Sequence, residues 1–322
     1  MSGSWLLASR FWLFGIVASD KQLVLAEVNR MHFRNYDKSG LDAQYNLRAA
    51  VKDYQNYFDR WDRRSEKARS ILRNRLDVAY GSKPLENLDI FFADQDNAPV
   101  AVFIHGGYWQ RLDKSQFSYI AEGFVHAGVT VVVLNYSLAP EVGMDEIAQQ
   151  SRKALAWIWR HAQDHQCNPN RIHVCGHSAG GHLTAVLAAT NWLTFGQDLP
   201  QNLIKGICAI SGIFDLEPIR LCYLNAVLGM NATVGKRNSP IYNLPQKGLP
   251  LILAVGELET DEFHRQTQTY AECWRAQGFP LEIIQMAGLH HFSIVDELAH
   301  PQSPLNQAVL RQIHGSPVED SS

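Results

Sequence analysis

A serine flanked by glycines lies where a strand-like segment gives way to a helix-like one. Residues 171–183 read RIHVCGHSAGGHL, and Gly176, Ser178 and Gly180 match the pattern G-x-S-x-G. In that pattern a sharp turn lifts the serine hydroxyl clear of its own backbone, so the residues two before and two after it must be small. The alternative interpretation is a glycine-rich turn with an incidental serine. The strand before the motif and the helix after it favour a nucleophilic Ser178.

A second pair of glycines follows an earlier apolar run. His105, Gly106 and Gly107 come directly after VAVFI. Glycine has no side chain to obstruct the approach of a ligand to its backbone N–H group. The N–H groups of Gly106 and Gly107, with that of Ala179 after the serine, are therefore predicted to form an oxyanion hole. His105 is expected to stabilise this loop through hydrogen bonds rather than to transfer protons.

A serine nucleophile needs a base, and the base needs an acid that orients it. With this serine motif, the acid is expected after a late strand. Glu259 is favoured because it lies far enough beyond Gly256 to clear the end of a strand. Asp261 and Glu262 are better suited to the first turn of a helix, where negative charge is favourable. Asp261 remains the alternative acid.

Two adjacent histidines, His290 and His291, follow the last strand-like run. The histidine base is expected in this loop, and only one of the two side chains can point at the serine. His291, which precedes Phe292 at the start of a helix, is predicted to be the base. His290 is predicted to be a surface or supporting residue.

The segments that must position these residues alternate between apolar strands and helices. Helix-like segments separate the apolar runs, and this alternation predicts an α/β fold with a mostly parallel sheet and helices on both faces. The strand-like runs, which are apolar enough for central parallel strands, are 100–107, 129–136, 171–176, 204–212, 250–257 and 281–288. The helix-like segments are 114–127, 144–165, 179–190 and 261–277.

Three further segments complete the expected architecture. Residues 45–73 place apolar side chains at helical spacings, which predicts an amphipathic helix lying on the core. The runs LDVAYG (76–81) and LDIFFAD (88–94) are predicted to form a hairpin or an edge pair. Residues 213–248 contain prolines and glycines that interrupt the alternation, and they predict a cap over the active-site end.

Composition limits the class of protein. The 322 residues are 46% hydrophobic with a formal charge of −3, so the chain has a large core and no basic stripe for nucleic acid. Five cysteines without metal or disulfide spacing favour a reducing compartment, the cytoplasm. FWLFGIVAS (11–19) is too short to span a bilayer, and a signal peptide is its less favoured interpretation. We therefore divide the chain into a leader, 1–30, and one domain, 31–322, with no membrane partner.

Six motifs together resemble the kynurenine formamidase (arylformamidase) group of α/β-hydrolases and its bacterial esterase relatives. They are HGGYWQ, NYSLAP, GHSAGGHL, SGIFDLEP, GELETDEFHRQ and HHFSIVDEL, and the resemblance extends from about Tyr45 to Leu305. It implies an α/β-hydrolase fold with a cap insertion, Ser178 as nucleophile, Glu259 as acid and His291 as base. Animal members usually carry aspartate at the acid position, so the glutamate is more similar to that of the bacterial members.

The expected function is a serine hydrolase without metal or cofactor. It would cleave small carboxylic esters or aryl formamides similar to N-formylkynurenine through an acyl- or formyl-enzyme on Ser178. The alternative, from a different class, is a non-catalytic binding protein on the same scaffold. The complete set of serine, acid, histidine and glycine loop favours the enzyme. The expected partner is the small-molecule substrate, and the sequence is compatible with a homodimer.

Aromatic residues near the motifs are candidates for the substrate pocket. Tyr108, Trp109, Tyr136 and Phe214 are predicted to line it, with core packing as the alternative for Tyr136 and Phe214. No metal site is expected, because the histidines that flank the serine motif lack a carboxylate or thiolate at ligand spacing.

Overall fold

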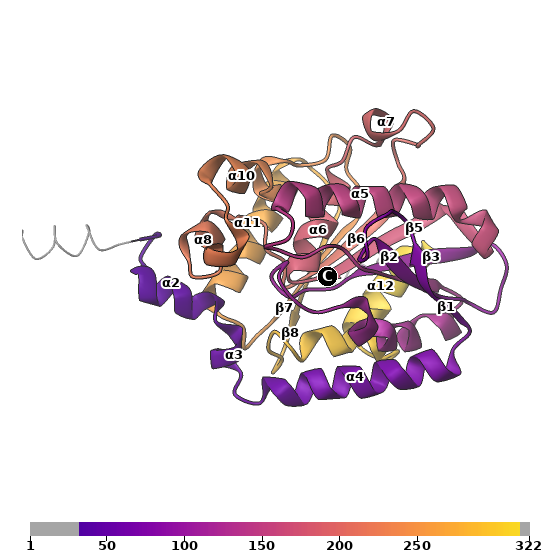
Figure 1. Cartoon of the computed structure of the whole chain (residues 1–322), viewed down its shortest axis with the longest axis horizontal. Coiled ribbons are helices and arrows are strands. Elements are labelled where there is room, and N and C mark those ends of the chain that lie inside the picture. Colours follow the sequence, from indigo (N-terminus) through magenta and orange to yellow (C-terminus); the bar gives the residue numbers. More distant parts are fainter. Residues whose placement is uncertain (1–31, 316–322) are drawn as a thin grey trace, which may run out of the picture.

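A mostly parallel sheet forms the centre of the molecule, as the alternating pattern predicted. The computed structural model describes residues 32–315, so the predicted leader, residues 1–30, lies outside the described part. The strands are β1 (Asn74–Ala79), β2 (Asn87–Phe91), β3 (Ala98–Ile104), β4 (Thr130–Leu134), β5 (Cys167–His177), β6 (Ile204–Ile210), β7 (Leu251–Gly256) and β8 (Leu281–Met286). Within the described residues these eight strands form one sheet in the order β1-β2-β4-β3-β5-β6-β7-β8 (Figure 1).

The direction of each strand agrees with the sequence pattern. β1 pairs with β2 in an antiparallel hairpin, and β2 is antiparallel to β4. All further pairs of adjacent strands, from β4–β3 to β7–β8, are parallel. Every residue of β3, β4 and β7 is buried, as expected for strands covered on both faces. The carboxyl ends of these parallel strands meet at one edge of the sheet, where ligand sites in such folds are built.

Helices cover both faces of this sheet. The α-helices are α2 (Lys38–Tyr45), α3 (Leu47–Ala50), α4 (Tyr54–Ile71), α5 (Met144–His161), α6 (Ala179–Ala188), α7 (Trp192–Phe195), α8 (Glu217–Leu221), α9 (Asn225–Leu228), α10 (Ala232–Arg237), α11 (Asp261–Ala276) and α12 (Pro304–His314). The 3-10 helices are η1 (Lys114–Gly123), η2 (Val125–Ala127), η3 (Gln163–His165), η4 (Pro240–Tyr242) and η5 (Ile294–Ala299). Helices α5 and α6 lie on one side of the sheet, whereas α12 and α4 lie on the other, with α4 packed on η1 (Figure 1).

Two of the helix predictions are corrected by the structure. The segment 45–73 is not one helix, because Asn46 ends α2 and its side chain accepts a hydrogen bond from the Ala49 N–H at the start of α3. The long helix α4 begins only at Tyr54. The segment 114–127 forms the 3-10 helices η1 and η2 instead of an α-helix. A pattern of apolar residues indicates which face is buried but does not fix these hydrogen-bonding details.

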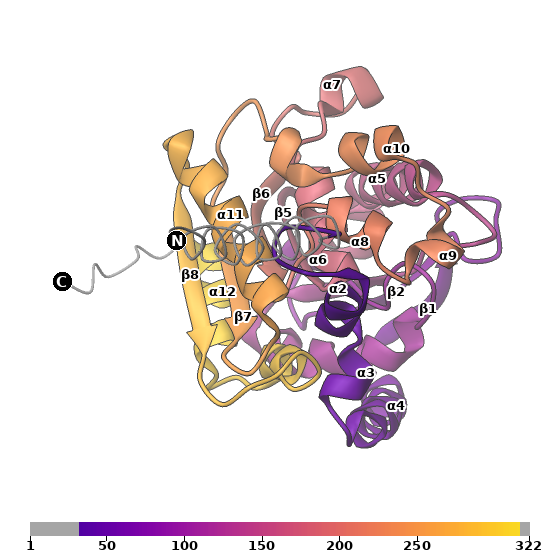
Figure 2. The ribbon, with the colours of Figure 1, turned by 90° about the vertical axis from the view of Figure 1, so that its left-hand side faces the viewer.

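The predicted interruption at 213–248 is a set of short helices between β6 and β7. It contains α8, α9, α10 and η4. Figure 2 views this end of the molecule and shows α2 beside α8, which contact each other. The cap over the sheet therefore has two parts, the expected insertion and an N-terminal part built from α2 and α3. The sequence analysis anticipated only the first.

Candidate active site

The turn between β5 and α6 places Ser178 in a strained backbone conformation. Ser178 has φ 58° and ψ −116°, an unusual combination for a residue other than glycine. A Cβ atom on Gly176 would lie 2.2 Å from the Gly180 carbonyl oxygen. A Cβ atom on Gly180 would lie 1.9 Å from the Ile104 carbonyl oxygen. Both glycines are therefore required by close backbone packing, and such strain at a serine is typical of a functional turn.

The loop after β3 lies directly beside this serine. A Cβ atom on Gly106 would be 3.1 Å from the Ser178 Cβ atom. Gly107 has φ +102°, a conformation that favours glycine. Ala179 is the first residue of α6, where backbone N–H groups have no partner within the helix. The structure thus brings together all three residues that were predicted to supply oxyanion N–H groups.

His105 supports the loop from the core. Its ring is stacked on Tyr136 at 4.5 Å, and its Nδ1 and Nε2 atoms lie 2.8 Å from the Gly106 carbonyl oxygen and 3.1 Å from Asn135 Oδ1. Complete burial lowers the pKa of His105, which favours a neutral ring. The hydroxyl of Tyr136 donates to the His105 carbonyl oxygen at 2.9 Å. These contacts hold the backbone of the glycine loop in place.

Glu259 and His291 form a buried hydrogen-bonded pair. Glu259 Oε2 lies 2.6 Å from His291 Nδ1, and the side chain of Glu259 is 0% exposed. The other carboxylate oxygen accepts hydrogen bonds from the Gly256 N–H and the Ser211 hydroxyl. The backbone at the end of β7 therefore fixes the carboxylate, which in turn fixes the imidazole.

The alternative acid, Asp261, and the second histidine, His290, lie elsewhere. Asp261 is exposed in the first turn of α11. His290 faces away from the serine, because its Nε2 atom lies 3.0 Å from the Tyr57 hydroxyl and its Nδ1 atom accepts the Phe292 N–H. Asp261 and His290 therefore lie outside the cavity, whereas His291 lines it and pairs with Glu259.

His177, directly before the serine, contacts the loop that carries His291. Its Nε2 atom lies 2.9 Å from the His291 carbonyl oxygen, and the two rings are 4.6 Å apart. Burial, together with the nearby His291, lowers the pKa of His177 well below its usual range. A neutral His177 donates from Nε2 to this carbonyl and so ties the histidine loop to the serine turn.

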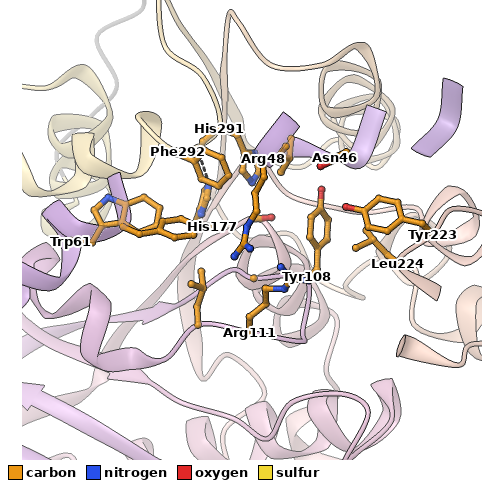
Figure 3. A pocket seen from close by; sticks show the side chains of 15 residues that line it. Asn46, Arg48, Trp61, Tyr108, Arg111, His177, Tyr223, Leu224, His291 and Phe292 are labelled. Atoms are coloured by element: carbon orange, nitrogen blue, oxygen red, sulfur yellow. Dashed lines mark hydrogen bonds between the residues drawn. The ribbon is translucent and has the colours of Figure 1, made fainter. Parts of the chain in front are cut away.

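A cavity of about 200 Å³ opens beside Ser178 (Figure 3). Its lining is mostly apolar and aromatic, and Ser178 and His291 both belong to it. The remaining lining residues come from the N-terminal segment (Asn46, Leu47, Arg48, Phe58, Trp61), the glycine loop (Gly107, Tyr108, Arg111, Leu112), the cap (Tyr223, Leu224), and the positions next to the serine and histidine (His177, Phe292).

Only one of the four predicted substrate-binding aromatic residues lines this cavity. Tyr108 does so, with its hydroxyl donating to the Tyr45 carbonyl oxygen at 2.9 Å. Trp109, Tyr136 and Phe214 are fully buried and belong to the core, so their assignment to the cavity is corrected. The Phe214 ring is stacked on Tyr270 at 4.2 Å, and Trp109 packs edge-on against His182.

The N-terminal wall of the cavity was not predicted from the sequence. Phe58 and Trp61 lie on the inner face of α4, and the Trp61 indole N–H donates to Asp296 Oδ1 at 2.8 Å. The Tyr119 hydroxyl donates to the same oxygen at 2.8 Å, and Arg60 pairs with this carboxylate. Asp296 lies in η5, just after the histidine loop, so one buried carboxylate joins the wall to the loop.

Residues 32–315 contain neither a cluster of metal-ligating side chains nor a helix that could cross a membrane. No group of three or more histidine, cysteine, aspartate or glutamate side chains in that range is arranged to hold a metal ion. None of the helices described there is both long enough and apolar enough to cross a membrane.

Comparisons with known proteins show which family the chain is similar to. The family model described as BD-FAE matches residues 88–261, which include the glycine loop, the serine motif and Glu259. The chain is 32% identical over 256 residues to the kynurenine formamidase of Danio rerio, covering 77% of this chain and 85% of that protein.

Two solved structures have the same fold. A Silicibacter protein provisionally described as a thioesterase has a TM-score of 0.74 and 29% identity, covering 85% of this chain and 98% of that one. Esterase B of Lactobacillus rhamnosis has a TM-score of 0.62 at 17% identity, covering 83% of this chain and 95% of that one. The chain therefore belongs to the BD-FAE family of α/β-hydrolases, is homologous to the kynurenine formamidases, and is a hydrolase of the esterase or formamidase type.

Proposed function

We propose that this chain is a serine hydrolase that cleaves small carboxylic esters or aryl formamides through an acyl- or formyl-enzyme on Ser178. The observation that carries this proposal is the buried hydrogen bond of 2.6 Å between Glu259 and His291, whose imidazole lines the same cavity as Ser178. A serine, an imidazole and a carboxylate in this order are the groups that nucleophilic acyl transfer requires.

The hydrogen bonds define the role of each atom. Because His291 Nδ1 contacts Glu259, its proton is directed to the carboxylate and Nε2 is left with a lone pair. In the first step, Nε2 takes the proton of the Ser178 hydroxyl as the serine oxygen attacks the substrate carbonyl. The imidazolium then donates this proton to the leaving alcohol or amine. In the second step, Nε2 takes a proton from water, which attacks the acyl or formyl carbonyl. The imidazolium then returns this proton to the Ser178 oxygen as its bond to the acyl carbon breaks, which releases the acid and regenerates the serine.

The glycine loop and α6 stabilise the charge that develops. The N–H groups of Gly106, Gly107 and Ala179 are the donors that we assign to the carbonyl oxygen as it becomes negative. Such donors act strongly because they are fixed before the reaction begins. The His105 and Tyr136 contacts to the loop serve this preorganisation.

The cavity favours a compact substrate with an apolar or aryl part. Its volume of about 200 Å³ lies below the range of about 300–1,000 Å³ that is usual for binding sites of drug-sized ligands. Phe58, Trp61 and Phe292 offer aromatic surfaces near His291. An aryl ester, an aryl formamide or a short acyl ester suits this space better than a long-chain lipid.

Turnover of defined substrates tests the proposed function. We expect hydrolysis of p-nitrophenyl acetate, p-nitrophenyl butyrate and N-formylkynurenine, with kcat/KM measured for each. A fluorophosphonate probe should label Ser178 alone, as read by peptide mass. Binding of these compounds without hydrolysis and without labelling would instead support a non-catalytic binding protein.

A second experiment concerns the acid. Glu259→Gln keeps the shape of the side chain, but its amide can donate to His291 Nδ1 and so favour the wrong tautomer. We expect kcat for p-nitrophenyl butyrate to fall by roughly 10²–10⁴. The matched variant Asp261→Asn removes only an exposed charge at the start of α11, with a stability cost of about 0.3–1 kcal/mol and little change in kcat. A larger loss of kcat in Asp261→Asn than in Glu259→Gln would contradict this assignment.

A further inference from the structure

Among the described residues that line the cavity beside Ser178, two are arginines and none is acidic. Arg48 lies in α3, and Arg111 lies in the loop that follows Gly107. Both residues are exposed, so they lie where the cavity meets solvent. Figure 3 shows the two side chains extending from opposite walls toward the same space, next to Tyr108. The mouth of an otherwise apolar cavity therefore carries two positive charges.

These charges are not neutralised within residues 32–315. Neither arginine forms a salt bridge there, whereas Arg64, Arg160 and Arg265 each pair with a carboxylate. Asp42, the acidic residue next to Tyr223, does not line the cavity and is already engaged. It pairs with Lys38 at 3.1 Å and accepts the Tyr223 backbone N–H at 2.7 Å.

The ring contacts of the Arg48 guanidinium and the backbone of Arg111 tie these two residues to the cavity wall. The guanidinium carbon of Arg48 lies 5.1 Å from the centre of the Tyr54 ring and 5.5 Å from that of Phe58, within the range of cation–π contacts. The backbone of Arg111 folds tightly onto the glycine loop, since a Cβ atom on Gly107 would lie 2.1 Å from the Arg111 carbonyl oxygen. The backbone of Arg111 is thereby fixed relative to the loop that we assign to the oxyanion.

We propose that Arg48 and Arg111 select esters or formamides that carry a carboxylate away from the reacting carbonyl. This inference rests on the proposed function of the same cavity. A guanidinium group matches a carboxylate with two parallel hydrogen bonds, and an arginine without a partner has these donors free. A cleft lined by charge of one sign also concentrates ligands of the opposite sign. The aryl or acyl part of the substrate then packs on Phe58, Trp61 and Phe292 while the carboxylate stays at the mouth.

A matched pair of esters tests the selection. The substrates are 3-carboxyphenyl acetate and its neutral isostere 3-carbamoylphenyl acetate, and the readout is the ratio of their kcat/KM values. We expect the chain to prefer the carboxylate and each of Arg48→Gln and Arg111→Gln to lower the ratio by about tenfold, the effect of losing a charged hydrogen bond that solvent weakens. Arg63→Gln, an exposed arginine of α4 outside the cavity, should leave the ratio unchanged. The preference should also shrink as the salt concentration rises.

A binding measurement separates this inference from the proposed catalysis. In the Ser178→Ala background, calorimetry with 3-acetamidobenzoate and 3-acetamidobenzamide measures selection without turnover. Tighter binding of the carboxylate, lost when either arginine is replaced by glutamine, supports the arginine site even if neither ester is hydrolysed. Equal binding of the two compounds, or a preference that survives both replacements, overturns it even if both esters are hydrolysed.

Discussion

Replacing Ser178 with alanine is expected to lower kcat for p-nitrophenyl butyrate by a factor on the order of 10⁴–10⁶, the loss seen when the nucleophile of a serine hydrolase is removed. The reason is that the acyl-enzyme can no longer form, so the remaining groups can only assist direct attack by water. The residual rate comes from the oxyanion donors and from substrate binding. Alanine keeps the Cβ atom and the small size that the turn between β5 and α6 demands.

The variant is expected to fold, because the serine hydroxyl takes no part in a hydrogen bond within the described residues. The backbone bonds of Ser178, from its N–H to Ile210 and from His182 to its carbonyl oxygen, do not depend on the side chain. A thermal unfolding midpoint and a circular dichroism spectrum check this point. Ser303→Ala is a matched control, since that hydroxyl caps α12 and does not line the cavity. A Ser178→Ala variant with kcat within tenfold of the parent would exclude Ser178 as nucleophile.

The serine turn and its neighbours could be predicted because their signals are local. A Cβ atom at position 176 or 180 would lie only 2.2 Å or 1.9 Å from a backbone oxygen, so both positions require glycine. This requirement appears in the sequence as a motif of five consecutive residues. The strands alternate with helices for an equally local reason, since each apolar run needs cover on both faces.

The lining of the cavity could not be predicted in the same way. Trp109 follows Tyr108 directly, yet one side chain is buried in the core and the other reaches the cavity, because both residues have positive φ values in a tightly folded loop. Tyr136 and Phe214 are near the motifs in sequence, but their rings stack on His105 and Tyr270. An aromatic side chain near a motif does not reveal the direction in which it points.

The N-terminal wall was missed because its signal is not local. Arg48, Phe58 and Trp61 precede the first strand. Their spacing does not indicate that α4 packs on η1, or that Trp61 contacts Asp296 next to the histidine loop. The sequence offered two signals: Trp61 lies on the apolar face of the predicted helix, and Asn46 is a residue type that often begins a helix. An amphipathic pattern identifies the buried face of a helix but not the element that covers it.

The second large effect is expected at His291. The His291→Ala variant should lose a factor on the order of 10⁴–10⁶ in kcat, because the serine hydroxyl then has no base and the Glu259 carboxylate has no imidazole to orient. The neighbouring His290→Ala variant should keep kcat within tenfold. It loses the contact with Tyr57 and the two N–H groups that His290 Nδ1 accepts, those of Phe292 and Ser293, which should cost stability of about 1–2 kcal/mol.

Two readouts separate a lost base from a disturbed loop. First, added imidazole should restore part of the turnover of His291→Ala, because the deleted ring leaves space in the cavity that a free imidazole can occupy, and it should not change His290→Ala. Second, unfolding midpoints should show that both variants stay folded at the assay temperature, although His291→Ala removes a buried ring that pairs with a buried carboxylate and His290→Ala removes hydrogen bonds to the backbone at Phe292 and Ser293. If His290→Ala instead loses turnover by orders of magnitude and is rescued by imidazole, the base is His290, and the loop must rearrange by one residue when the substrate binds.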